Sequence, residues 1–128
     1  MKTTQSGNAP SVSLSRRSTR KQSVKPVGVR RMKTPEQKVI DEVVRWAEGY
    51  SILCLPIAVR GDRGWPDYIF IDECGCHIWI EFKRAGKRPR KLQAVRLLAL
   101  ANQGAEAYYF DNAADAIQRL ADSYGYTQ

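Results

Sequence analysis

The 128-residue chain divides into two segments of very different charge, and this division limits what can fold. Residues 1–33 contain no acidic residue, are rich in serine and threonine, and have few apolar side chains. Their basic residues are Lys2, Arg16, Arg17, Arg20, Lys21, Lys25, Arg30, Arg31 and Lys33. Such a segment cannot bury enough apolar surface to offset its ordering entropy. We therefore predict a disordered basic arm over residues 1–33 and a single folded domain over residues 34–128.

The folded part has the composition of one soluble domain. It carries 12 of the 21 basic residues and all 13 acidic ones, and 43% of the whole chain is hydrophobic. No stretch approaches the roughly 18 apolar residues that span a bilayer, and no apolar core of a secretory signal is present. Three cysteines, an odd number, argue against a disulfide framework. We expect a cytoplasmic protein that is neither secreted nor bound to a membrane.

The basic arm admits three interpretations. It can act as a solubility tail, or it can attract the phosphates of a nucleic acid without regard to sequence. An arginine-rich and serine-rich start can also be an organelle transit peptide. The third interpretation is the weakest, because the few apolar residues of the arm do not fall on one face of a helix. Charge alone does not separate the first two.

Apolar periodicity and turn signals predict the order α-β-β-β-α-β-α. The predicted helices cover residues 35–49, 89–103 and 113–121, and the predicted strands cover residues 51–59, 67–71, 77–83 and 106–110. Thr34 and Gln37 form a capping box at the first helix, and Gly75 suits the left-handed residue of a short hairpin loop. Asp111 or Asn112 caps the last helix. This order indicates an α/β domain with a mixed central sheet flanked by helices.

Three residues of the predicted hairpin carry chemistry. In a hairpin centred on Cys74, residues whose numbers sum to 148 face each other, so Asp67 lies opposite Glu81, with Lys83 on the same face. Two opposed carboxylates are unfavourable unless a cation lies between them, and such oxygens suit Mg²⁺ or Mn²⁺. A metal and a lysine at this place predict hydrolysis of a phosphodiester. The alternative is a solvated hairpin with weak ion pairs.

Further polar residues are predicted to lie near this pair. Glu36 falls at the centre of the apolar arc of the first helix and therefore points toward the sheet. Gln93 and Arg96 share one face of the second helix. Between strand and helix lies a basic stretch that we predict to contact phosphates. The predicted nucleic-acid-binding residues are Arg84, Lys87, Arg88, Arg90, Lys91 and Arg96.

The motif residues have a characteristic spacing along the chain. They are Gly64, Pro66, Asp67, Glu81, Lys83, Gly86 and Gln93. In this spacing and in its α-β-β-β-α-β order, the chain resembles the VRR-NUC branch of the PD-(D/E)xK nuclease superfamily over about residues 34–121. The resemblance implies a restriction-endonuclease-like core with Mg²⁺ or Mn²⁺ as cofactor. Its metal ligands would be Asp67 and Glu81, with Glu36 completing or supporting the site, and its other catalytic residues would be Lys83 and Gln93.

The resemblance also implies a substrate and an assembly. DNA is the expected substrate, with structure-selective cleavage of branched, flapped or four-way-junction forms in replication, recombination or repair. Small stand-alone members of the branch suggest a homodimer. The chain departs from the usual pattern in its long basic arm and in the bulky Trp65. A non-catalytic nucleic-acid-binding module on the same fold is the alternative, although the motif retains Asp67, Glu81 and Lys83.

Two other motifs are weaker. Cys54 and Arg60 have the spacing of a cysteine phosphatase, but the run between them is apolar and β-branched, whereas a phosphate cradle needs glycines and converging backbone N–H groups. Cys74, Cys76 and His77 could suggest zinc, but they lack a fourth ligand and the usual spacing. Neither motif is expected to form a site.

Overall fold

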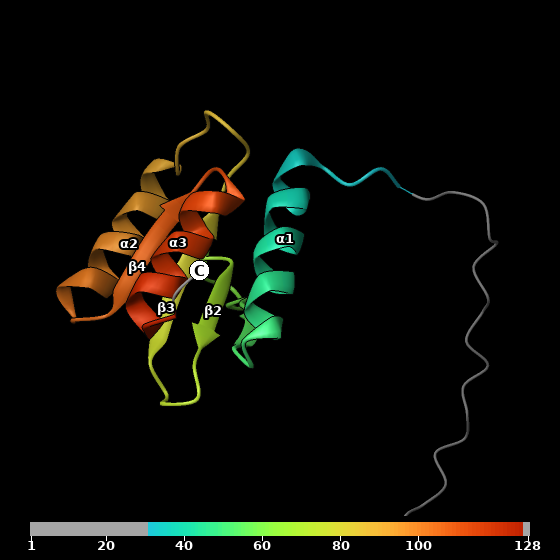
Figure 1. The fold of residues 1–128 in the computed structure, drawn as a ribbon. Coiled ribbons are helices and arrows are strands. Elements are labelled where there is room, and N and C mark those ends of the chain that lie inside the picture. Colours follow the sequence, from blue (N-terminus) through green and yellow to red (C-terminus); the bar gives the residue numbers. More distant parts are fainter. Residues whose placement is uncertain (1–30, 127–128) are drawn as a thin grey trace, which may run out of the picture. The chain divides into compact units, whose positions relative to one another are not determined.

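A four-stranded mixed sheet with helices on both faces forms the folded domain (Figure 1). The computed structural model describes residues 31–126. Its elements are α1 (Pro35–Gly49), β1 (Leu53–Pro56), β2 (Tyr68–Ile71), β3 (His77–Phe82), α2 (Lys91–Asn102), β4 (Glu106–Phe110) and α3 (Ala113–Tyr124). The strand order is β1-β2-β3-β4, with antiparallel β1–β2 and β2–β3 pairs and a parallel β3–β4 pair. This confirms the predicted element order and the mixed α/β sheet.

The register of the central hairpin is the predicted one. Tyr68 lies opposite Ile80 and Phe70 opposite Ile78, so facing residue numbers sum to 148. Gly75 turns the chain at a φ of 82°, a left-handed conformation in which glycine pays no side-chain penalty. Asp67 and Glu81 each lie one residue past the last pair, at the same end of the hairpin, where the Phe82 N–H donates to the Asp67 side chain.

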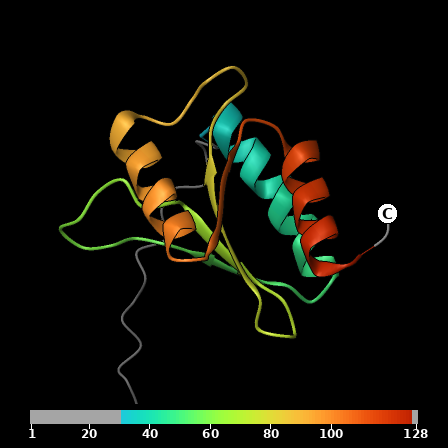
Figure 2. The ribbon, with the colours of Figure 1, turned by 90° about the vertical axis from the view of Figure 1, so that its left-hand side faces the viewer.

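The two faces of the sheet have different roles. Ile78, Ile80 and Phe82 of β3 are fully buried against α1 and α3, where they form the hydrophobic core with Phe70 and Leu120. The alternate residues of β3 point to the opposite face, which α2 covers. Figure 2 shows α1 and α3 on one side of the sheet and α2 on the other. The polar end of β3 is therefore separated from the core and directed toward α2.

The parallel pair places two loops at one edge of the sheet. Phe82 at the end of β3 is paired with Phe110 at the end of β4, and the Lys83 N–H donates to the Phe110 carbonyl over 2.9 Å. Since parallel strands end at the same edge, the basic loop after β3 and the turn after β4 leave the sheet together. This edge, with the start of α2 above it, holds the predicted site residues.

Local signals set most of the element ends. Thr34 Oγ1 accepts from the Gln37 N–H over 3.1 Å and caps α1, as predicted. The first strand, Leu53–Pro56, is shorter than residues 51–59 at both ends: Ser51 has a φ of 59°, which is not a strand conformation, and Pro56, the last paired residue, has no N–H. The Ile57 N–H still donates to the Asp67 carbonyl over 2.8 Å. This bond ties β1 to the residue that begins the site.

Three helix ends differ from the predicted ones, and the smallest difference is the end of α2 at Asn102 in place of residue 103. The second helix begins at Lys91 and not at Pro89, because Arg90 has an extended backbone at φ −64° and ψ 161°. The last helix continues three residues past the predicted end, to Tyr124. Asn112 is its cap, with Oδ1 accepting from the Asp115 N–H over 2.8 Å, which decides between the two candidates.

The remaining sequence predictions concern the arm and the membrane. The disordered arm predicted over residues 1–33 lies outside the described residues except for its last three. Of these, Lys33 forms an ion pair with Asp41 of α1. Among residues 31–126, no helix is long and apolar enough to cross a membrane.

Candidate active site

Asp67 lies directly before β2, which begins at Tyr68. Its Oδ2 accepts from the Phe82 N–H of β3 over 2.9 Å, which fixes the carboxylate across the hairpin. The side chain is half-buried, and this burial raises the pKa of Asp67 above its ordinary value, against the opposing effects of the Phe82 N–H and of Lys83. The structure thus holds a carboxylate where its charge is not fully solvated.

Glu81 is the most deeply buried ionisable group of the site. Its side chain is 2% exposed, and its Oε1 accepts from Gln93 Nε2 over 2.8 Å and lies 3.3 Å from Lys83 Nζ. Its Oε2 is buried without a hydrogen-bond partner among the described residues. Burial, and next the charge of Asp67, raise the pKa of Glu81 to about 7. An unpartnered oxygen of this kind is costly unless a ligand completes it.

Gln93 links the start of α2 to this carboxylate. Its Oε1 accepts from the Arg90 N–H over 2.8 Å, while its Nε2 donates to Glu81. Both ends of the amide are therefore used, and the bonds determine which end is oxygen and which is nitrogen. Gln93 therefore lies next to the hairpin residues, as predicted.

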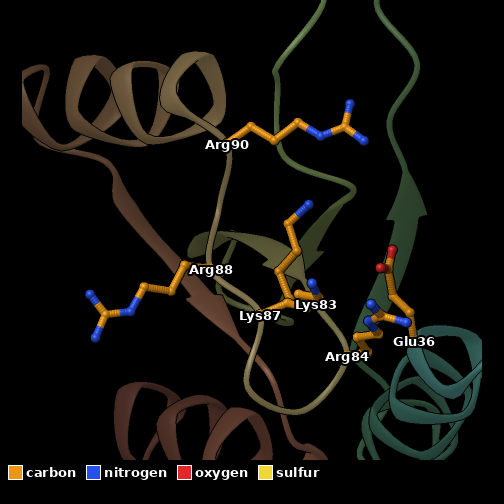
Figure 3. Close-up of a pocket in the computed structure, with 6 residues that line it drawn as sticks. All are labelled: Glu36, Lys83, Arg84, Lys87, Arg88 and Arg90. Atoms are coloured by element: carbon orange, nitrogen blue, oxygen red, sulfur yellow. The ribbon is translucent and has the colours of Figure 1, made fainter.

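Glu36 and Lys83 line a pocket together with the basic loop (Figure 3). The pocket has a volume of about 400 Å³, and its other lining residues are Arg84, Lys87, Arg88 and Arg90. Glu36 projects from α1 toward this space, and its charge contributes to the raised pKa of Glu81. In Figure 3, Arg88 points away from the other side chains. The site therefore combines the carboxylates of Asp67 and Glu81 with a neighbouring pocket that is lined mainly by basic side chains.

Two of the predicted phosphate-binding residues lie outside this pocket. Lys91 is exposed at the first position of α2. Arg96 is engaged elsewhere, since its Nη2 donates to Asp62 Oδ1 over 2.6 Å and its guanidinium lies 4.7 Å from the centre of the Trp65 ring. Arg96 thus holds the loop before β2.

The donor set of the site fits a hard divalent cation. Asp67 and Glu81 supply carboxylate oxygens on one face, and Glu81 Oε2 has no other partner in the described part of the chain. Across residues 31–126, no three His, Cys, Asp or Glu side chains gather closely enough to hold a metal ion, and Glu36 lines the neighbouring pocket from α1. Mg²⁺ commonly takes one or two carboxylates and completes its shell with water and phosphate oxygens.

Asp111 has a place in the site that the sequence did not reveal. Its Oδ2 accepts from the Gly86 N–H over 3.0 Å and so holds the basic loop. Gly86 has a φ of 80°, a conformation that favours glycine. The available signal was the parallel pairing of β3 and β4, which brings the residue after β4 beside the loop after β3. From sequence we considered Asp111 only as a helix cap.

The cysteine motifs form no site in the described structure. Cys54 is half-buried in β1, and burial raises the pKa of its thiol to about 11, whereas a nucleophilic cysteine needs a lowered pKa. Cys74, Cys76 and His77 are exposed around the hairpin turn, and they do not form a metal-binding group within residues 31–126.

Comparison with solved structures finds a domain with the same architecture. It is described as a VRR_NUC domain, is 20% identical in sequence, and superposes with a TM-score of 0.65 over 72% of this chain and 99% of that one. The chain has the VRR-NUC fold. No family model matches the sequence, and no curated protein matches it.

The likeness confirms, at the level of the fold, the resemblance to VRR-NUC nucleases that the motif spacing indicated. Because nearly the whole of the compared VRR-NUC domain is covered, the chain contains a complete nuclease-fold domain. Asp67, Glu81 and Lys83 therefore lie together on a VRR-NUC scaffold, at the end of its central hairpin.

Proposed function

We propose that the chain is a metal-dependent nuclease that hydrolyses phosphodiester bonds of DNA. The observation that carries this proposal is the buried Glu81, whose Oε2 has no partner in the described residues and whose neighbours are Asp67 and Lys83. The charge of Asp67 raises the pKa of Glu81, so the ionised pair lowers the stability of the metal-free protein, which is understandable if the two carboxylates bind a cation. The VRR-NUC fold and the basic pocket support the same function.

Asp67 and Glu81 would hold the metal, Mg²⁺ or Mn²⁺. When bound, such an ion polarises a phosphodiester oxygen and lowers the pKa of water. The protein's own residues keep the carboxylates in place: the Phe82 N–H orients Asp67, and Gln93 orients Glu81. These bonds leave Glu81 Oε2 available, since it has no other partner in the described structure.

Lys83 supplies the positive charge at the reacting group. Its side chain is 14% exposed and its Nζ lies 3.3 Å from Glu81 Oε1, so the ammonium is held at the boundary between the buried pair and the pocket. At this place it can orient a nucleophilic water or offset negative charge that develops on the phosphoryl oxygens. Glu36, on the opposite wall, supports the metal site through its charge.

The basic loop would position the substrate. Arg84, Lys87 and Arg90 line the same pocket as Lys83, where they can contact DNA phosphates without reading sequence. Such contacts suit recognition of DNA shape, and with the sequence resemblance they support preference for branched, flapped or four-way-junction DNA. The three free cysteines, two of them exposed, support action inside the cell.

Cleavage of labelled DNA tests this function directly. The wild type and the variants Asp67→Asn and Lys83→Ala are incubated with a four-way junction, a flap, plain duplex and RNA, in Mg²⁺, Mn²⁺ or EDTA. We expect metal-dependent cutting of DNA that falls on the order of 100-fold or more in both variants. Glu42→Gln, which removes an exposed carboxylate of α1, serves as the control and should cut normally. Binding without cutting in every metal would instead support the non-catalytic module.

We further propose that the chain forms a homodimer through the outer face of α2. No residue of α2 is fully buried, and Val95 and Leu98 are 51% and 61% exposed, with Leu92 beside them. A contiguous apolar stripe of this kind is typical of an interaction surface. Light scattering after size exclusion should show a dimer for the wild type and a monomer for Leu98→Glu, with Gln118→Glu on α3 as the control. A wild-type monomer at all concentrations would contradict the proposal.

A further inference from the structure

A second, smaller basic pocket lies between the loop before β2 and the first turn of α2. Its volume is about 130 Å³, and its lining residues are Arg63, Gly64, Arg90, Leu92 and Gln93. Arg90 also lines the larger pocket around Lys83, so the two pockets meet at this side chain. In Figure 3, Arg90 points away from Arg88, out of the basic loop. Positive charge therefore continues past Gln93 to Arg63.

The loop that carries Arg63 is fixed to α2 by several polar contacts. Arg96 Nη2 donates to Asp62 Oδ1 over 2.6 Å, and Arg96 Nε donates to the Arg63 carbonyl over 3.3 Å. Trp65 Nε1 donates to Asp62 Oδ2 over 2.9 Å, and the same ring lies under the Arg96 guanidinium. Both oxygens of Asp62 are thus occupied, which leaves its charge paired with Arg96 and not with Arg63.

Gly64 allows the loop to approach the helix closely. A Cβ at this position would lie 2.7 Å from Leu92 Cγ and 3.4 Å from Arg96 Cγ, and the φ of Gly64 is 90°. Only glycine tolerates both conditions without a shift. The loop therefore packs directly on the first turn of α2, and this contact brings Arg63 near Arg90.

The charge of this pocket is not neutralised within the described structure. Neither Arg63 nor Arg90 belongs to an ion pair among residues 31–126, and none of the residues that line the pocket is acidic. Two arginines that come from different segments and line one small space suit a single phosphate group, because each guanidinium group can donate two parallel hydrogen bonds to it. Gln93, which holds Glu81, forms part of the same wall.

We infer that Arg63 and Arg90 form a second phosphate subsite, which binds a phosphate of the DNA next to the one that is cut. This inference rests on the proposed nuclease function and extends it to substrate positioning. The bound strand would pass over Gln93, with one phosphate at Arg63 and Arg90 and the scissile phosphate at the Asp67, Glu81 and Lys83 site. Arg63 is then a binding residue that sets where the strand lies, and it takes no part in the chemical step.

Salt-dependent binding and cleavage kinetics of Arg63→Ala test this subsite. Binding of a labelled four-way junction is measured over a series of salt concentrations in the Asp67→Asn background with EDTA, where the weakened site and the absence of metal keep the DNA intact. Loss of one phosphate contact should weaken binding at physiological salt and reduce the slope of log K against log salt by about one. In the active protein, KM should rise about 5–10-fold, which corresponds to the net contribution of about one ordinary hydrogen bond, while kcat changes less than twofold.

Two further variants distinguish loss of the Arg63–phosphate contact from a general loss of positive charge or of folding. Arg45→Ala removes an exposed arginine of α1, and it should leave both slope and KM as in the wild type. Arg63→Lys keeps the charge, and it should restore the slope. Equal slopes for Arg63→Ala, Arg45→Ala and the wild type would overturn the subsite, even if the protein cuts DNA. Absence of cutting by the wild type would overturn the nuclease function, while the binding slopes would still decide the subsite.

Discussion

Gln93 Nε2 donates to Glu81 Oε1 over 2.8 Å, and the other end of the same amide accepts from the backbone at the start of α2. The buried carboxylate is therefore oriented by the helix that covers its face of the sheet. In a site of this kind, the residue that orients a ligand matters nearly as much as the ligand itself.

Replacing Gln93 by alanine should lower cleavage about 10–100-fold, because Glu81 loses the donor that fixes its rotamer. The loss should appear mainly in kcat, because the Gln93 amide orients the carboxylate through its nitrogen and contacts the basic loop only through the backbone N–H of Arg90. Single-turnover and steady-state cleavage of the preferred DNA measure the two parameters. Gln118→Ala on α3, which removes an exposed glutamine, is the control. A normal kcat in Gln93→Ala would show that the bond has no role in the reaction.

The metal-free protein should become less stable as pH rises through neutrality. The pKa of Glu81 is raised from its ordinary 4.5 to about 7, mainly by burial, so the folded state holds a proton that the unfolded state has released. This contribution to stability is complete below the ordinary pKa and is lost as pH passes about 7. The raised pKa of Asp67 acts in the same direction.

Thermal unfolding in EDTA between about pH 5 and pH 8 measures this effect. The wild-type Tm should fall over the interval by more than that of Glu81→Gln, which has no proton to lose at this position. Added Mg²⁺ should raise the wild-type Tm more at pH 8 than at pH 5, because the ligands must be ionised to bind it. If the Tm of the two proteins falls equally with pH, Glu81 does not have the raised pKa that this prediction requires.

Local patterns predicted the hairpin and the central pair. Period-2 alternation and the turn at Gly75 determine the register, so the meeting of Asp67 and Glu81 followed from arithmetic along the chain. Gln93 could be placed near them because the helix period and the short basic loop restrict where that face points. These positions depend on residues close in sequence or on strand pairing, and both can be read from the pattern of apolar residues.

Contacts between loops could not be predicted in this way. Arg96 was expected to bind phosphate, but it pairs with Asp62, 34 residues away, and that pairing depends on how the loop before β2 packs on α2. Asp111 and Gly86, 25 residues apart, meet only because β3 and β4 run parallel. Neither contact leaves a periodic signal, since loop conformation is decided by packing in three dimensions.

Deletion of residues 1–31 should weaken DNA binding and flatten its salt dependence while cleavage remains. The segment carries eight of the 21 basic residues, and each phosphate it neutralises adds to the salt slope. The deletion keeps Lys33, which pairs with Asp41 of α1. Titration of labelled duplex at several salt concentrations measures the slope. If the shortened chain gives the slope of the full chain, the arm does not contact DNA.

Gly64→Ala should destabilise the protein more than Gly61→Ala, although both glycines have positive φ. A side chain at either position costs roughly 1–2 kcal/mol for the left-handed backbone. At Gly61 nothing lies within 4 Å of the added Cβ, whereas at Gly64 the Cβ would meet Leu92 at 2.7 Å. The additional crowding should cost about 1–3 kcal/mol in the free energy of unfolding, measured with urea.

The same pair of variants also reports on function. Since Leu92 precedes Gln93 in the first turn of α2, displacement of Leu92 should move the amide that orients Glu81. Cleavage by Gly64→Ala at a temperature where it is fully folded should therefore be slower than that by Gly61→Ala. Equal cleavage rates for the two folded variants would show that the packing of the loop on α2 stabilises the domain without positioning the site.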